Sequence, residues 1–205
     1  MKSIARLIGF LLLALSPGCK ARSAKPDTAP VSGTASHWPV PAGWSHETFS
    51  LPPQFAPTLA YHGTEELRFI PGFSAPIAPD FRSYDFVWWL SEPPIFDAAT
   101  LAAAFTTYFR GLATTVGGSK YQFDPARFRS VLVVQSAGGR ERLTGQVFSH
   151  DPFSTGHPIA LNLEAELRRC PATGQAAIVV ALSPRGVTDT LRTALRAAAS
   201  NIGGT

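Results

Sequence analysis

The stretch HPIALNLEAELRRCPATGQAAIVVALS, residues 157–183, decides the fold class of this chain. Its first part, 157–169, alternates apolar and polar residues with a period of two, as in a strand that buries one face. A helix is the alternative, since Leu, Glu and Ala favour helices, but the sustained alternation favours a strand. The turn-forming segment 170–175 leads into 176–183, an apolar run typical of a buried central strand. Two strands joined by so short a turn are antiparallel.

Other β-prone segments extend this pattern on both sides. The segment 81–91, FRSYDFVWWLS, is apolar on both faces and predicts a central strand covered on two sides, and 64–70 predicts a shorter strand. Residues 127–136 and 142–150 flank a Gly-Gly connection and predict a hairpin. The apolar segment 49–57 carries three prolines. Because proline cannot donate to a ladder, this segment predicts an edge strand at best, or an extended segment.

Two segments change to the helical period. In 95–112, Asp97 can cap the N-terminus, and apolar residues then recur at helical spacing. Residues 188–203 carry one apolar stripe between a capping Thr or Asp and a terminating Gly. Strands, a helix, further strands and a final helix predict an α+β fold, a mostly antiparallel sheet of about 5–7 strands with two packed helices. This layout is similar to that of the PsbP/Mog1-like fold.

Residues 1–18 have the three parts of a secretory signal peptide. Lys2 and Arg6 give a basic start, an apolar run covers 7–15, and small residues precede Cys19. The run is much shorter than the roughly 20 residues that a membrane-spanning helix needs. A buried core helix or a permanent anchor is the alternative, and the basic start argues against it.

The segment LSPGC, residues 15–19, resembles the lipobox of bacterial lipoproteins, in which Gly or Ala precedes a cysteine that receives lipid. It departs from that pattern at Ser16, where the family prefers Leu, and at Pro17. The resemblance implies that Cys19 is lipidated and anchors the protein, because several acyl chains bind a membrane firmly. Ordinary signal cleavage nearby is the alternative. Lys20, in place of Asp, implies an outer-membrane location in the cell envelope, facing the periplasm or the exterior.

Residues 19–42 connect the signal peptide to the folded body. Small residues, proline and lysine dominate them without an apolar period, which predicts a flexible tether. We therefore expect a signal peptide at 1–18, a lipidated cysteine and tether at 19–42, and a single α+β domain at 43–205. Loss of Lys2 and Arg6 with the signal peptide lowers the formal net charge from +4 to +2. That charge is too small to indicate a nucleic-acid surface.

The body also resembles a group of bacterial secreted proteins of about this length that have no assigned activity. The shared features are Gly43-Trp44, Phe55-Ala56-Pro57, the segment EELRFIPG at 65–72, and Trp88-Trp89. The resemblance covers about residues 43 to 200, and it implies no activity for the chain.

The loop HDPFSTGH, residues 150–157, is the most polar segment that could hold a ligand. His150, Asp151 and His157 are candidate binding residues there, and with the loop serine they could form a metal site or a Ser-His-Asp arrangement. A hairpin connection is the favoured interpretation, because the chain has no nucleophile elbow and no HExxH motif. Trp88 and Trp89 could line a sugar or lipid groove, and Trp89 is the candidate binding residue of the two, since we expect it to be the more exposed. Neighbouring strand residues face opposite ways, so the favoured interpretation is that both tryptophans belong to the core.

The chain has two cysteines, Cys19 and Cys170, which are too few for a structural zinc site. Lipidation would use the sulfur of Cys19, so we expect no disulfide between them and a partly shielded, unpaired thiol at Cys170. The leading functional hypothesis is a non-enzymatic envelope lipoprotein, a binding or assembly module without a cofactor, for a protein or small-molecule ligand. The alternative is an envelope hydrolase that uses the 150–157 loop.

Overall fold

The structure, a computed structural model, describes residues 38–137, 140–169 and 175–200. The expected signal peptide, the lipidation site Cys19, most of the expected tether and the thiol of Cys170 lie outside these residues. Among the described helices, none has both the length and the apolar character needed to cross a bilayer.

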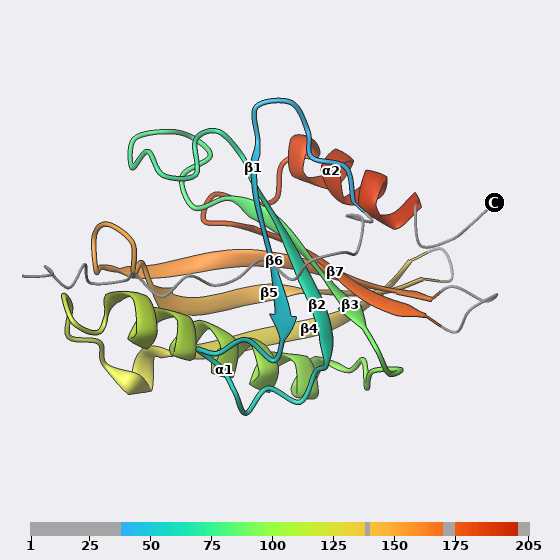
Figure 1. Cartoon of the computed structure of the whole chain (residues 1–205), viewed down its shortest axis with the longest axis horizontal. Coiled ribbons are helices and arrows are strands. Elements are labelled where there is room, and N and C mark those ends of the chain that lie inside the picture. Colours follow the sequence, from blue (N-terminus) through green and yellow to red (C-terminus); the bar gives the residue numbers. More distant parts are fainter. Residues whose placement is uncertain (1–37, 138–139, 170–174, 201–205) are drawn as a thin grey trace, which may run out of the picture.

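Seven antiparallel strands form one open sheet in the order β1-β2-β3-β7-β6-β5-β4 (Figure 1). The sheet lies between two helices, α1 on one face and α2 on the other (Figure 1). This confirms the α+β prediction, while the likeness to the PsbP/Mog1-like fold stays a prediction. The elements are β1 (Ser45–Leu51), β2 (Gly63–Phe69), β3 (Tyr84–Leu90), α1 (Ala98–Gly117), η1 (Pro125–Arg127), β4 (Arg129–Ala137), β5 (Arg140–His150), β6 (Pro158–Arg169), β7 (Ala176–Ser183) and α2 (Asp189–Ser200).

The alternation of β6 and the hairpin of β4 and β5 follow the sequence prediction. Residues 161, 163 and 165 of β6 are buried, and the residues between them are half-buried. The Asp97 side chain accepts a hydrogen bond from the Thr100 backbone and caps α1, as its position before the apolar period predicts. The long alternating strand is therefore a strand and not the alternative helix.

The pairing of β3 with β7 joins the two halves of the sheet, with Trp88 opposite Ile178. Every residue of β3 is buried, and its side chains alternate between the two faces. Trp88 and Phe86 lie in the larger core beneath α1, whereas Val87 and Trp89 lie in a smaller cluster on the α2 face. Trp88 is fully buried and Trp89 is only 8% exposed, so both belong to the core, as favoured, and Trp89 offers no binding surface.

Trp38 extends the folded body beyond the expected start at residue 43. Its side chain is fully buried in the cluster on the α2 face, and its indole N–H donates to the Ala194 carbonyl at 3.1 Å. The Arg68 guanidinium lies 4.6 Å from the Trp38 ring centroid and also donates to the Trp38 carbonyl. The boundary between tether and domain therefore lies at or before Trp38, because this ring fills a gap between the sheet and α2.

The proline-rich segment 49–57 contributes the end of an edge strand and then an irregular connection. β1 ends at Leu51, directly before Pro52 and Pro53, which cannot continue a ladder. The chain then passes so close to α1 that a Cβ on Gly111 would lie 2.0 Å from the Phe55 carbonyl oxygen. This contact fixes the segment against the helix and shapes the space between α1 and β1.

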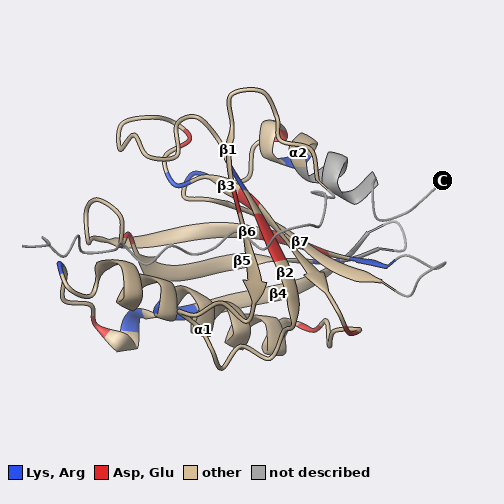
Figure 2. Cartoon of the chain, in the orientation of Figure 1, with Lys and Arg blue, Asp and Glu red and all other residues tan. Residues whose placement is uncertain are grey.

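The charged side chains are sparse and spread over several elements (Figure 2). Acidic residues are conspicuous on the central strands β2 and β3, where Glu65, Glu66 and Asp85 are buried (Figure 2). Glu66 forms an ion pair with Arg68 at 2.7 Å, but neither oxygen of Asp85 has a hydrogen-bond partner. Burial raises the pKa of Asp85 well above its ordinary value.

We predict that Trp38→Ala destabilises the chain by about 3–5 kcal/mol, the usual effect of truncating a fully buried tryptophan. Val40→Ala is the matched control, since Val40 lies in the same segment and is 40% exposed. Urea unfolding of both variants measures the difference. Equal free energies of unfolding for the two variants would contradict the assignment of Trp38 to the folded domain.

Candidate ligand cavity

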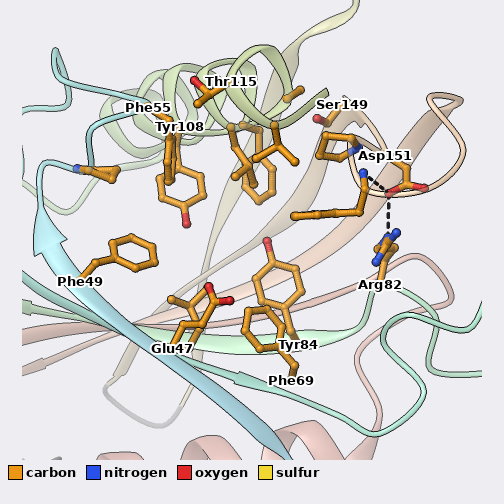
Figure 3. A pocket seen from close by; sticks show the side chains of 18 of the residues that line it. Glu47, Phe49, Phe55, Phe69, Arg82, Tyr84, Tyr108, Thr115, Ser149 and Asp151 are labelled. Carbon is orange, nitrogen blue, oxygen red and sulfur yellow. Dashed lines mark hydrogen bonds and ion pairs between the residues drawn. The ribbon is translucent and has the colours of Figure 1, made fainter. Parts of the chain in front are cut away.

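A cavity of about 760 Å³ lies between the β1–β2 end of the sheet and the C-terminal half of α1 (Figure 3). Small-molecule sites usually measure about 300–1,000 Å³. Residues of β1, the following segment, β2, α1, β6 and the 149–153 segment line it. The cavity is thus built from parts of the chain that are far apart in sequence.

Aromatic rings make up much of the cavity wall. Phe55 and Tyr108 pack edge to face with ring centroids 4.9 Å apart, and Phe49 lies 6.1 Å from Phe55. On the opposite wall Phe69 and Tyr84 are 5.6 Å apart (Figure 3). Each ring is held by another ring, so the wall is a fixed apolar surface.

The cavity is open to solvent along the edge strand. Glu47 and Thr48 of β1 are exposed, as are Thr115 and Val116 near the end of α1, and all four line the cavity. Phe153 forms part of the rim on the side of the 150–157 loop and is 46% exposed. A ligand could therefore enter between β1 and α1 without unfolding the sheet.

An ion pair between Arg82 and Asp151 closes one end of the cavity (Figure 3). The Arg82 Nε donates to Asp151 at 2.8 Å, and its Nη2 donates to the Ser154 hydroxyl at 2.8 Å. Asp151 also accepts from the backbone N–H and the hydroxyl of Thr155, both at 2.9 Å. Burial raises the pKa of Asp151, but hydrogen bonds from Arg82, Ser154 and Thr155 outweigh it and bring that pKa to about 2. Asp151 is therefore an ionised residue that holds the loop together.

His150 lies beside this pair but does not contact it through its ring. Its Nδ1 is 3.1 Å from the Gly156 carbonyl oxygen, which can only accept, so Nδ1 carries the proton. The ring packs between Phe123 and Phe128, with centroid distances of 5.0 and 5.4 Å. Its Nε2 is buried and has no hydrogen-bond partner. The histidine ring is thus held in place as part of the loop.

The four predicted binding residues do not form one site. His150 and Asp151 line the cavity, whereas His157 is exposed outside it and Trp89 is buried on the other face of the sheet. The Ser154 hydroxyl donates a hydrogen bond to Asp151 at 2.8 Å, and the His150 ring does not lie between them. The three residues therefore do not form a Ser-His-Asp arrangement. No group of three metal-ligating side chains occurs in the described part of the chain.

Glu65 is a buried carboxyl directly behind the cavity wall, and the sequence analysis assigned it no role. It is fully buried on β2, and its Oε1 accepts a hydrogen bond of 2.9 Å from the hydroxyl of Tyr108, which lines the cavity. Burial raises the pKa of Glu65 from 4.5 to about 8, hydrogen bonds from Tyr108 and Trp88 oppose the rise, and the negative charge of Glu47 adds to it. Glu65 is therefore protonated near neutral pH.

The available sequence signal for Glu65 was its phase in the strand. Glu65, Leu67 and Phe69 alternate and share the face toward α1, which places the carboxyl in the core. A charged residue in a short strand is usually at the surface, so the strand phase alone does not predict this burial.

No protein-family model, no curated protein and no solved structure matches the chain. The two resemblances noted in the sequence therefore stay predictions. The functional argument depends on the geometry of the cavity.

We predict that Glu65→Gln removes a pH dependence of stability. Between about pH 4.5 and about pH 8 the folded chain keeps a proton that the unfolded chain has lost, so the wild-type free energy of unfolding falls as pH rises. The fall is on the order of 1.4 kcal/mol for each pH unit inside this window. Glutamine can still accept from Tyr108 but cannot ionise.

The measurement is chemical denaturation of both proteins across this pH range. The free energy of unfolding of Glu65→Gln, relative to that of the wild type, should rise steadily toward alkaline pH. Glu92→Gln, at an exposed glutamate outside the cavity, is the charge-matched control. Parallel curves for Glu65→Gln and wild type would contradict the assignment of a buried, protonated carboxyl.

Proposed function

We propose that this chain is a lipid-anchored protein of the cell envelope whose domain binds a small apolar ligand without catalysing a reaction. The observation that supports this function best is the cavity of about 760 Å³, walled by aromatic and aliphatic side chains and open along β1. A large apolar pocket with few polar groups is the usual form of a small-molecule site.

The size of the cavity itself supports an occupant. It falls within the range of small-molecule sites, and its apolar wall is accessible to solvent along β1. An apolar ligand would remove both this wall and its own surface from water, so binding has a direct physical driving force.

The chemistry of the 150–157 loop favours binding over the hydrolase alternative. Asp151 is occupied by Arg82, Ser154 and Thr155, and His150 donates its ring proton to a backbone carbonyl. A serine nucleophile needs a base within hydrogen-bond reach that is itself oriented by a third group. The loop instead uses its polar groups to hold its own conformation and one end of the cavity.

The expected anchor fits a carrier or binding role at a membrane. A coil between Cys19 and Trp38 would span about 25 Å on average, which leaves the cavity mouth within reach of the bilayer. A protein held there could take up apolar molecules that partition into the membrane or leave it. This part of the proposal depends on lipidation of Cys19.

We predict that the folded domain binds the neutral apolar probe N-phenylnaphthylamine at one saturable site, detected by its fluorescence. Leu112→Trp replaces an aliphatic side chain of the cavity wall with a large ring. The indole would occupy part of the cavity, so binding of the probe should weaken by about tenfold or more. Val131→Trp is the matched control, since Val131 is 55% exposed on β4 and outside the cavity. Equal weakening by both variants, or by neither, would contradict binding in the cavity.

We predict that the mature protein begins at a lipidated Cys19. Mass spectrometry of the N-terminal peptide from the native membrane fraction should find an acylated cysteine. Cys19→Ala should leave the precursor unlipidated, with its membrane attachment lost or altered. An intact Met1, or a mature N-terminus beyond Cys19, would refute the anchor while leaving the cavity argument unchanged.

A further inference from the structure

We propose that the ligand of this cavity is a cationic amphiphile, with an apolar body among the aromatic rings and an ammonium group at Glu47. The inference rests on the proposed function, because it assigns the chemical class of the ligand to that same cavity. It follows from the charges of the wall and from the position of the rings.

The charges that line the cavity do not cancel. Arg82 is neutralised by Asp151 at 2.8 Å and lies against the rings of Phe73 and Phe153, so it offers little free positive charge to a ligand. Glu47, toward the other end, lines the cavity and has no ion-pair or hydrogen-bond partner within the described residues. The wall therefore carries one uncompensated negative charge.

The Glu47 side chain points into the cavity from β1 (Figure 3). Its neighbour on the same face of the strand is Phe49, and its charge contributes to the raised pKa of Tyr108. The faces of Phe and Tyr rings attract an ammonium group, and a carboxylate beside them adds direct charge attraction. A cation at this place would meet both a carboxylate and aromatic faces.

Glu65 gives the same end of the cavity a second, hidden carboxyl. It lies behind Tyr108, which donates to its Oε1, and the Trp88 side chain is a further hydrogen-bond partner of this carboxyl. A positive charge in front of Tyr108 would favour ionisation of this carboxyl, whereas an anionic ligand would oppose it. Glu47 thus supplies the charge that selects a cation, and the protonated Glu65 does not oppose one.

Three probes with the same decyl chain separate the apolar contribution from the charge. They are decyltrimethylammonium, decanol and decanoate, measured by calorimetry near neutral pH. The two ions are kept below their critical micelle concentrations and decanol below its solubility limit. The cation should bind about tenfold more tightly than decanoate, with decanol between them, and added salt should reduce this preference. Glu47→Gln should remove most of the preference and leave the affinity for decanol within about twofold.

Glu92→Gln is the matched control, because it removes the same charge from an exposed loop outside the cavity and should keep the preference. If decanol binds but the three probes show equal affinity, or decanoate is preferred, the charge assignment is overturned and the apolar site stands. A preference that survives Glu47→Gln also overturns it, since the charge would then lie elsewhere. If none of the probes binds, the proposed function fails as well.

Discussion

The ladder between β3 and β7 is the interaction on which the rest of the structure depends. It pairs residues 84–90 with 176–182 and joins three N-terminal strands to four strands from later in the chain. Both strands are buried along their whole length, so the ladder lies in an apolar environment on both faces. The hydrophobic burial of these two strands stabilises the sheet as a single unit.

This topology also explains why a cavity exists. α1 follows β3 at the centre of the sheet and precedes β4 at its far edge, and it packs mainly on β4 and β5. The half of the same face formed by β1 and β2 lies farther from the helix and is covered by aromatic side chains and by the segment after β1. Rings are rigid and meet edge to face, so they can frame a space without collapsing into it.

The sequence predicted the elements that depend on local pattern. The alternation of 157–169, the apolar run of 176–183 and the Asp97 cap each act within one segment, and each was confirmed. The burial of Trp38 could not be predicted from its neighbours in the sequence, which have the composition of a tether. Its contacts come from distant residues such as Ala194 and Arg68. The cavity could not be predicted, since Glu47, Tyr108 and Asp151 come together only through the order of the strands.

The central claim is that the space between β1 and α1 is a ligand site, and nuclear magnetic resonance with bound decanol tests it most directly. We expect intermolecular Overhauser effects from the decyl chain to the methyl groups of Leu112, Ile159 and Leu161, which line the cavity. The exposed methyl groups of Val131 and Val133 on β4 should show none. Contacts with those valines instead, or no contact with the cavity methyl groups at saturating decanol, would contradict the account.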